Sequence, residues 1–356
     1  MATIYELRDR LRSGDVWVHG ASRYADPAGL ILSEERLVDV RADFHLLTGT
    51  AITAATHLHE TRTAIAERAV RLEERLGDGI DITDSKPTLI PLRSEHDPRI
   101  ESIRWAIGGL LPRVDLADVL IEVDSWCHYT DQLTHAAGAT PRSVEHRRLL
   151  FAAVLAQACN LGISAMGEIS DVTSRQLAWT TDWHLRDDTL RRAVAQIVKH
   201  HHRLPGASVW GSGIMSSSDG QRFPVPVSSI TATALPRYFN RGRGVQMYTW
   251  TLDQHSQYGS KIVPATVRDA VHVLDELLDN EADLPITEHT TDTAGYTDLI
   301  FGLFDLVGLT FSPRLQDQAG SARLWIMPLR RVSTRHWSGS CCRAGTSPPK
   351  PRPARR

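Results

Sequence analysis

The apolar pattern of the chain changes at Gly206, and this change limits the fold more than any other feature. Before it, apolar residues recur with the 3.6-residue period of amphipathic helices, as in 116–126 and 190–198. After it, short alternating and β-branched runs predict strands, with an amphipathic helix between two of them. The predicted strands are 207–218, 223–227, 245–252, 260–263, 284–291 and 309–314, and the predicted helices among them are 266–278 and 297–306. Thr266 and Asp269 are expected to cap the helix at 266–278.

Four polar residues stand where predicted helices of the first half begin. Ser33, Asp115, Ser143 and Asp187 each precede an apolar-periodic segment, and serine and aspartate are favoured helix N-caps. The segment that begins at Ser143 predicts a single helix to about residue 166. We therefore expect an α/β fold, α+β overall, in which a helical N-terminal half precedes a mixed sheet with helices.

Two aspartates follow predicted strands. Asp219 comes after 207–218 and Asp292 after 284–291, and they are 73 positions apart (292 − 219). Side chains at the ends of neighbouring strands share one edge of a sheet, and carboxylate oxygens suit Mg²⁺ and Mn²⁺. The pattern predicts a two-aspartate metal site. The alternative stays open, because an aspartate before a glycine at a strand end is more often a turn residue.

Four polar residues could contact a phosphate near such a site. Gln221 and Arg222 follow Asp219, and Arg241 and Arg243 lie in a basic, glycine-containing segment. A turn that contacts a DNA backbone and a plain hairpin fit that segment equally well. The adjacent histidines 200–202 could also suggest a metal site, but neighbours on a helix point about 100° apart. We expect them to form a solvated helix end rather than a zinc site.

Composition excludes some classes of protein. The 356 residues carry a formal net charge of −2, so global charge gives no indication of nucleic-acid binding. The four cysteines lack zinc-finger or redox spacing, and no N-terminal apolar signal core is present. The longest apolar stretch, 151–166, is too short and too polar to span a bilayer. These features predict a reduced, cytoplasmic protein without a membrane segment.

The order of the predicted elements gives three regions. Strands, helix, strand, helix and strand, with acids after two strands, form the front half of a ribonuclease H-like domain. We expect a helical scaffold or dimerisation region at 1–205 and a partial ribonuclease H-like catalytic domain at 206–317. The segment 318–356 has no acidic residue, many arginines and a proline-rich run, and follows neither period, so we expect a disordered basic tail.

In combination, the motifs resemble the Tn-three family of bacterial DDE transposases. The resemblance covers about residues 5–317, and the Ser-Ser-Asp-Gly-Gln and Thr-Asp-Thr-Ala-Gly motifs at Asp219 and Asp292 are its most specific parts. Further matching segments are 14–18, 113–117, 122–124, 176–179, 201–205, 265–268, 272–275 and 311–314. The resemblance reverses the preference for a plain turn at Asp219.

The resemblance implies that Asp219 and Asp292 are the first two members of the DDE triad. They would bind Mg²⁺ or Mn²⁺ for 3′-end nicking and strand transfer on transposon-end DNA. The third member, a glutamate, has no counterpart, because no glutamate follows Glu288. The chain is thus expected to be an internal fragment without the N-terminal DNA-binding region and the C-terminal part of the catalytic domain. Its tail would be translated out of frame.

Three functional hypotheses follow. The first is a DDE transposase by descent, impaired because the third carboxylate is missing. The second is a non-catalytic module that pairs with an intact transposase and inhibits it, or forms a homodimer, through the helical half. The third is a decayed gene product without a role.

Overall fold

The computed structural model describes residues 31–74, 80–83, 86–89, 97–138, 143–226, 229 and 231–314, with isolated positions before residue 31. The chain divides into two units, 1–70 with 306–308, and 71–305 with 309–356. The first unit holds α2 (Glu34–Thr48) and most of α3 (Ala54–Glu74). The Ser33 side chain caps α2 by accepting the Arg36 N–H, as expected. The tail predicted at 318–356 lies outside the described residues.

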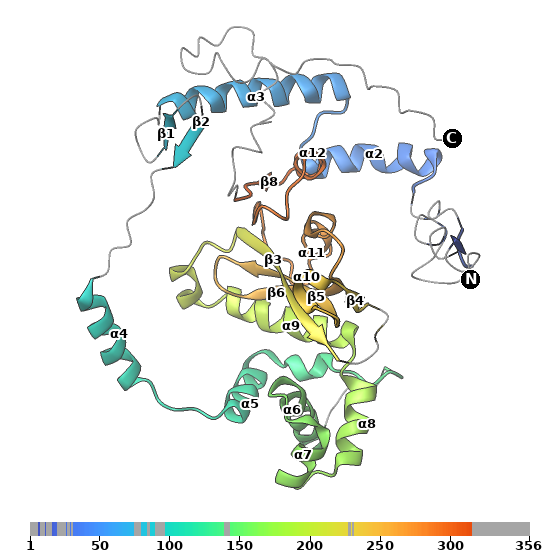
Figure 1. Ribbon diagram of the computed structural model, residues 1–356, viewed down its shortest axis with the longest axis vertical. Coiled ribbons are helices and arrows are strands. Elements are labelled where there is room, and N and C mark those ends of the chain that lie inside the picture. The colour runs from blue at the N-terminus through green and yellow to red at the C-terminus, as the bar shows by residue number, and fades with distance from the viewer. Residues whose placement is uncertain are drawn as a thin grey trace. The chain divides into compact units, whose positions relative to one another are not determined.

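In the second unit, a series of helices comes before the main sheet (Figure 1). They are α4 (Pro98–Leu110), α5 (Leu116–Cys127), η2 (Tyr129–Gln132), α6 (Val144–Ala158), α7 (Gly162–Ile169), α8 (Ser174–His184) and α9 (Asp187–His202), preceded by the hairpin of β1 (Ile80–Thr83) and β2 (Lys86–Leu89). Ser143 caps α6 by accepting the His146 N–H, and Asp115 stands at the N-cap of α5 without a side-chain hydrogen bond. The cap predicted at Asp187 is wrong, because Asp187 is the first residue of α9 and Arg186 holds the N-cap position. The predicted helical half is confirmed. No helix within the described ranges has the length and apolar character needed to cross a membrane.

The helix predicted from Ser143 to residue 166 is two helices. The backbone turns left-handed at Asn160 (φ 52°) and Gly162 (φ 77°), which ends α6 and lets α7 start in a new direction. The following helix, α8, was not predicted from the sequence. It begins with a capping box in which Thr173 and Gln176 satisfy each other's backbone N–H groups.

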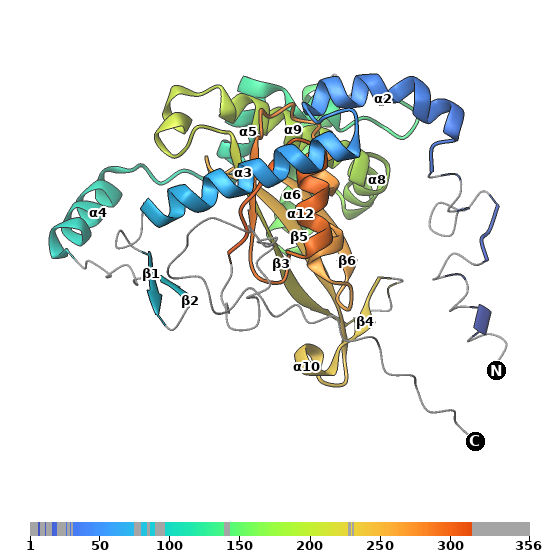
Figure 2. The same cartoon turned by 90° about the horizontal axis from the view of Figure 1, so that it is seen from above.

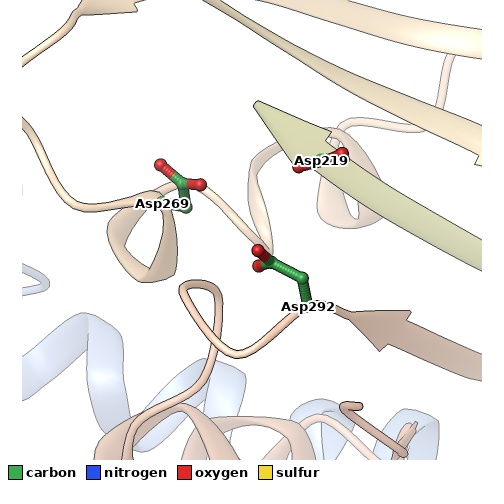
Figure 3. Close-up of side chains that lie close together, drawn as sticks. All are labelled: Asp219, Asp269 and Asp292. Atoms are coloured by element: carbon green, nitrogen blue, oxygen red, sulfur yellow. The ribbon is translucent and has the colours of Figure 1, made fainter. Parts of the chain in front are cut away.

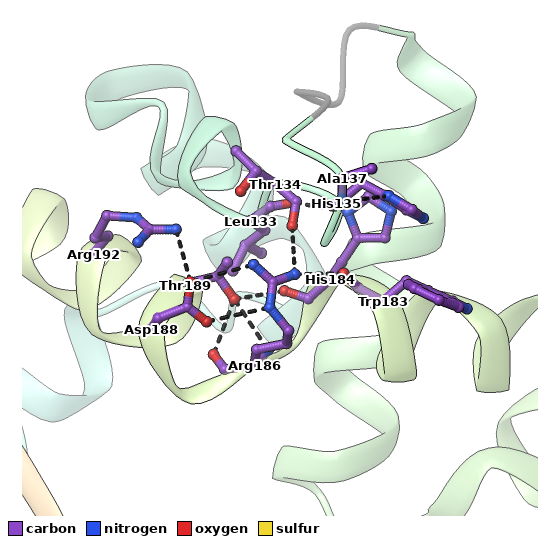
Figure 4. Close-up of polar contacts among 10 residues, drawn as sticks. All are labelled: Leu133, Thr134, His135, Ala137, Trp183, His184, Arg186, Asp188, Thr189 and Arg192. Atoms are coloured by element: carbon purple, nitrogen blue, oxygen red, sulfur yellow. Dashed lines mark hydrogen bonds and ion pairs between the residues drawn. The ribbon is translucent and has the colours of Figure 1, made fainter. Parts of the chain in front are cut away.

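Polar contacts fix the corner between α8 and α9 (Figure 4). The Arg186 guanidinium donates to the carbonyl oxygens of Thr134 (2.9 Å) and Trp183 (2.6 Å). The buried His184 donates from Nδ1 to the Leu133 carbonyl at 2.8 Å. These bonds attach both helices to the segment after η2, so the orientation of α9 within this unit is set by side-chain contacts to backbone.

The rest of the unit is a mixed sheet of order β4-β5-β3-β7-β8. β6 pairs with the same edge of β5 as β4, opposite β3. Figure 2 shows β3, β5 and β6 side by side. The strands are β3 (Met215–Val225), β4 (Thr233–Ala234), β5 (Arg243–Leu252), β6 (Gln257–Pro264), β7 (Glu288–Thr291) and β8 (Thr310–Phe311). β3 pairs antiparallel with β5 and parallel with β7. The expected α/β fold, with a mixed sheet of parallel and antiparallel pairs, is confirmed.

One face of the sheet carries the main core. Alternate residues of β5 are buried, and Tyr248 and Trp250 are 0% exposed. They share an apolar cluster with Val198 of α9 and Phe304 of α12 (Asp298–Leu306). The Trp250 Nε1–H donates to the Val273 carbonyl at 3.0 Å, so the buried indole has its polar partner.

The strand predicted to end at residue 218 is wrong in its bounds. Residues 205–209 form the 3₁₀-helix η3 (Pro205–Val209), and β3 runs without a break through Asp219 to Val225. No separate strand begins at Phe223. β3 continues beyond Asp219 because the neighbouring strand β5 pairs with it as far as Val225. The parallel partner β7 stops at the pair Ser218–Thr291, so Asp219 lies at the end of the parallel pairing only.

The helix predicted at 266–278 is also wrong. The structure has the 3₁₀-turn η4 (Asp269–Val271) and a single helical turn, α11 (Asp275–Leu278). The Asp269 side chain is buried and accepts a hydrogen bond from Gln246, so it does not cap a helix. The predicted strands 284–291 and 309–314 are shortened to β7 and β8.

The histidines at the end of α9 do not form the solvated end that was expected. His201 Nδ1 lies 2.5 Å from Ser256 Oγ, and His202 Nδ1 lies 3.0 Å from Gln254 Oε1. Their neighbour His200 stacks on Trp126, with ring centroids 5.9 Å apart. The histidines therefore connect α9 to the turn between β5 and β6 and to α5.

Candidate active site

Three carboxylates from three elements converge near the end of the parallel strands (Figure 3). They belong to Asp219 in β3, Asp269 at the start of η4, and Asp292 directly after β7. One oxygen of each lies within 4.8 Å of the corresponding oxygens of the other two. Asp219 and Asp292 are exposed, and Asp269 is 5% exposed. The cluster thus has two accessible carboxylates and one buried carboxylate.

The strand register explains why Asp219 and Asp292 meet. Ser218 and Thr291 form the last pair of the parallel ladder, so the next residue of each strand is the aspartate. Parallel strands leave their carboxyl ends at one edge of a sheet, where α/β proteins commonly bind ligands. The structure therefore brings together the two aspartates that the sequence singled out.

Backbone amides orient both accessible carboxylates. Asp219 Oδ1 accepts the Gly220 N–H at 2.7 Å. Asp292 Oδ1 accepts the N–H groups of Ala294 at 2.9 Å and Gly295 at 3.2 Å, which folds the following loop into a tight turn. A Cβ at Gly295 would lie 2.7 Å from the Thr291 Cβ, so this turn requires glycine there. In both aspartates the second oxygen stays available.

Burial and mutual repulsion act on the same carboxyl group. Burial raises the pKa of Asp219 above its ordinary value, and the charges of Asp292 and Asp269 raise it further, while the Gly220 N–H opposes the shift. A bound cation would reverse this balance, since it stabilises all three carboxylates in their charged form. An all-oxygen donor set of this kind suits a hard divalent ion such as Mg²⁺ or Mn²⁺.

The four predicted phosphate-contact residues occupy different places. Gln221 is exposed and shares a face of β3 with Asp219, two positions along the strand. Arg222 is on the opposite face, with its guanidinium 4.5 Å from the centroid of the Tyr238 ring. Arg241 and Arg243 are exposed, and Arg243 pairs with Val225, six residues along β3 from Asp219. That separation is about 20 Å along a strand. The structure groups only Gln221 directly with the carboxylates.

Sequence reasoning missed three residues around the carboxylates. Asp269 was interpreted as a helix cap, and its neighbour Arg268 was not singled out. Arg268 reaches the loop after Asp292 and donates to the carbonyl oxygens of Ala294 (3.4 Å) and Tyr296 (3.3 Å). Gln246 of β5 donates to Asp269. In the sequence, the only indication that Asp269 belongs to the site is its position shortly after β6, the strand that pairs with β5.

The region that holds the three carboxylates matches a known protein family. Residues 118–336 match the family model described as the Tn3 transposase DDE domain, which includes all three carboxylates and extends past the boundary expected at 317. The transposase for transposon Tn1546 of Enterococcus faecium is 36% identical over 324 residues, which are 90% of this chain and 32% of that protein.

Other transposases give the same result. The transposase for transposon Tn501 of Pseudomonas aeruginosa is 33% identical over 92% of this chain and 33% of its own length. The transposase for transposon gamma-delta of Escherichia coli K12 is 34% identical over 91% of this chain and 33% of its own length. The chain thus spans about a third of the curated relatives that it matches.

Among solved structures, the Mos1 transposase paired-end complex with left transposon end aligns with 50% of this chain and 60% of that chain. The identity is 14% and the TM-score is 0.22, so this alignment carries no weight for the site. The family match needs no such support, because it covers more than half of the 356 residues. The chain belongs to the Tn3 family of DDE transposases.

Proposed function

We propose that this chain provides a metal-dependent phosphoryl-transfer centre for DNA transposition, acting on transposon-end DNA in the bacterial cytoplasm. Asp219 and Asp292 would hold Mg²⁺ or Mn²⁺ for 3′-end nicking and strand transfer. The observation that supports this most is the convergence of the two carboxylates at the end of adjacent parallel strands, each with an oxygen left for a ligand. The chain's relatives are named as transposases for transposons.

The proposed chemistry assigns a task to each part of the site. A divalent cation bound here would activate a water or a DNA 3′-hydroxyl and stabilise charge on the transferred phosphate. The amides of Gly220 and Gly295 keep the two carboxylates oriented before the DNA arrives. Gln221 presents its amide on the same face as Asp219, where it can donate to a phosphate oxygen.

The test is nicking of duplex DNA that carries a transposon end of the family, with Mn²⁺ as the metal. Asp219→Asn and Asp292→Asn should each lower the nicking rate about 100-fold or more, because each removes a charged ligand of the cation. Asp298→Asn is the matched control, since Asp298 is an exposed acid outside the cluster. Nicking that survives both substitutions in the cluster would refute the assignment.

The expected impairment stays a prediction. Because no glutamate follows Glu288 to match the third member of the family's triad, we propose that the wild-type chain nicks DNA slowly. Rapid multiple-turnover nicking that depends on Asp219 would contradict it.

A non-catalytic pairing module is the second candidate function. The exposed apolar residues of the helical half favour it, since α4 buries no residue and Trp105 and Leu110 are 80% and 84% exposed. We propose co-purification with a full-length family transposase as its test. Wild type should associate at micromolar concentration and Trp105→Ala should associate less. No association of the wild type would remove this candidate.

A further inference from the structure

Asp269 differs from the other buried acids of the described residues. Asp124 has donors on both oxygens, the N–H and the hydroxyl of Thr130, each at 2.8 Å. Buried Glu276 forms an ion pair with Arg191 at 3.0 Å. Asp269 is equally buried, yet it forms no ion pair within the described ranges and has one neutral hydrogen-bond donor. A buried carboxylate without a neighbouring cation destabilises the folded state, so a cation bound beside Asp269 would stabilise it.

The one bond that Asp269 accepts fixes its orientation. Gln246 is 0% exposed on β5, and its amide nitrogen donates to Asp269 Oδ1. The other oxygen, Oδ2, faces Gly220, where a Cβ built on the backbone would lie 3.2 Å from it. The same Cβ would collide with the Gln246 amide. Glycine at position 220 therefore leaves the space in which Asp269 approaches β3.

The three carboxylates share one pattern of hydrogen bonding. Asp219, Asp269 and Asp292 each accept protein hydrogen bonds at Oδ1. At Oδ2, none of the three has a donor among the residues that the structure describes. Each carboxylate thus has a free oxygen, and one oxygen of each lies within 4.8 Å of the corresponding oxygens of the other two. This arrangement fits a small hard cation that keeps water in its remaining positions.

We infer that Asp269 is a third carboxylate ligand of the divalent cation, beside Asp219 and Asp292. This inference rests on the proposed function, because the cation is that of the phosphoryl-transfer centre. The third ligand then comes from the turn between β6 and α11, ahead of Asp292 in the sequence. The cation in turn supplies the charge that buried Asp269 lacks.

The test is Mn²⁺ binding to the full chain, measured by loss of the free-ion electron paramagnetic resonance signal. Asp269→Asn keeps the size of the side chain and an oxygen that can accept from Gln246, but removes its charge. We expect this change to weaken Mn²⁺ binding at least about tenfold, since loss even of groups outside the ligand set costs 10–100-fold. Asp298→Asn should bind Mn²⁺ as the wild type does.

The outcomes separate this inference from the proposed function. If Asp219→Asn and Asp292→Asn weaken Mn²⁺ binding while Asp269→Asn stays within twofold of wild type, the third ligand is refuted and the proposed function stands. If the wild type binds no Mn²⁺ at millimolar concentration, both fail.

Thermal unfolding distinguishes a ligand from a structural residue. In EDTA, Asp269→Asn should melt no lower than wild type, because it removes an uncompensated buried charge. With Mn²⁺ added, the wild type should gain melting temperature and the variant should gain less. A variant that melts several degrees lower in EDTA and keeps the full Mn²⁺-induced gain would assign Asp269 a structural role and overturn the inference.

A second variant is designed to displace Oδ2 of Asp269 without changing any charge. Gly220→Ala places a methyl group between β3 and the Asp269–Gln246 pair, so it should displace Oδ2 and weaken Mn²⁺ binding. Gly206→Ala is the matched control, since a Cβ there meets nothing within 4 Å. Wild-type Mn²⁺ affinity in a folded Gly220→Ala chain would contradict the placement of Asp269 at the cation.

Discussion

His289 shows how a single residue couples the sheet to pH. It is 0% exposed, and its two ring nitrogens lie 2.6 Å from Ser216 Oγ and 2.8 Å from Ser218 Oγ. Its ring also stacks on Phe304, with centroids 5.9 Å apart. Burial lowers the pKa of His289 from 6.5 to about 3, because the charged imidazolium would lose its hydration. The folded chain therefore holds His289 neutral across the physiological range.

We predict that the free energy of unfolding falls as the pH is lowered from about 6.5 towards 3. Over this window the unfolded state binds a proton at His289 and the folded state does not, so acid favours unfolding. The contribution of this one group approaches about 1.4 kcal/mol per pH unit. Urea unfolding of the wild type and of His289→Gln, at pH 7, 6 and 5, measures it.

The control for this experiment is the comparison of slopes. His146 and His184 also have pKa values lowered by burial, and they act in the same direction in both proteins. The wild type should therefore lose stability with acid more steeply than His289→Gln. Parallel pH profiles for the two proteins would show that His289 does not titrate as described.

At the same scale, the sequence identified two carboxylates of the site and missed the third. Asp219 and Asp292 directly follow the last pair of a parallel ladder. Their position could be predicted because the apolar pattern of each strand indicates where the parallel pairing stops. Asp269 stands three positions after Thr266, a spacing typical of helix caps. What places its side chain at the site is a hydrogen bond from Gln246, 23 positions earlier on strand β5. Local patterns carry no information about such a partner.

At the scale of elements, local signals predicted starts better than ends. The side chains of Ser33 and Ser143 cap helices as expected, since a cap depends on the next three residues only. The bounds of β3 were wrong, because its pairing with β5 decides how far it continues, and β5 begins 18 positions after Val225 (243 − 225). Non-local pairing therefore limits what can be predicted for strands.

Arg191 links α9 to the segment around α11. Its guanidinium lies 3.0 Å from Glu276 and 2.9 Å from Asp279. Burial raises the pKa of Glu276, and Arg191 counteracts this shift. We predict that Arg191→Ala lowers the free energy of unfolding by on the order of 3 kcal/mol, because buried Glu276 loses its partner. Chemical denaturation at pH 7 measures the change.

The neighbouring arginine provides the control for this prediction. Arg192 pairs with Asp188 at 3.2 Å across an exposed helix surface. Surface pairs of this kind contribute about 0–1 kcal/mol, so Arg192→Ala should change stability little. If both variants lose the same free energy of unfolding, the contact between Arg191 and Glu276 stabilises the chain no more than a surface pair does.

At the scale of the whole molecule, the helical half and the sheet share packing. Ala195 and Val198 of α9 belong to the same apolar cluster as Tyr248 and Trp250 of β5. The boundary expected at 205 thus falls directly after a helix that packs on the sheet, and the separate roles of 1–205 and 206–317 stay predictions. The sequence revealed the change from helices to strands, while the shared core depends on contacts between distant segments.

Charge at this scale determines how the chain would meet DNA. The formal net charge is −2, so attraction to phosphates must come from local groups such as Arg241 and Arg243, which are both exposed. We predict that Arg241→Ala and Arg243→Ala each reduce the slope of log affinity against log salt by about 0.9, the value for one phosphate contact on duplex DNA. Fluorescence anisotropy with a labelled duplex at several salt concentrations measures the slopes.

The same experiment separates backbone contacts from sequence recognition. Because a phosphate contact is independent of sequence, both variants should weaken binding equally on a transposon-end duplex and on an unrelated duplex. Arg192→Ala is the control, since this partly exposed arginine already pairs with Asp188. If the Arg241→Ala, Arg243→Ala double variant keeps the wild-type slope, the basic segment at the start of β5 makes no DNA contact. In that case the phosphate contacts must lie nearer the carboxylates, where Gln221 is exposed beside Asp219.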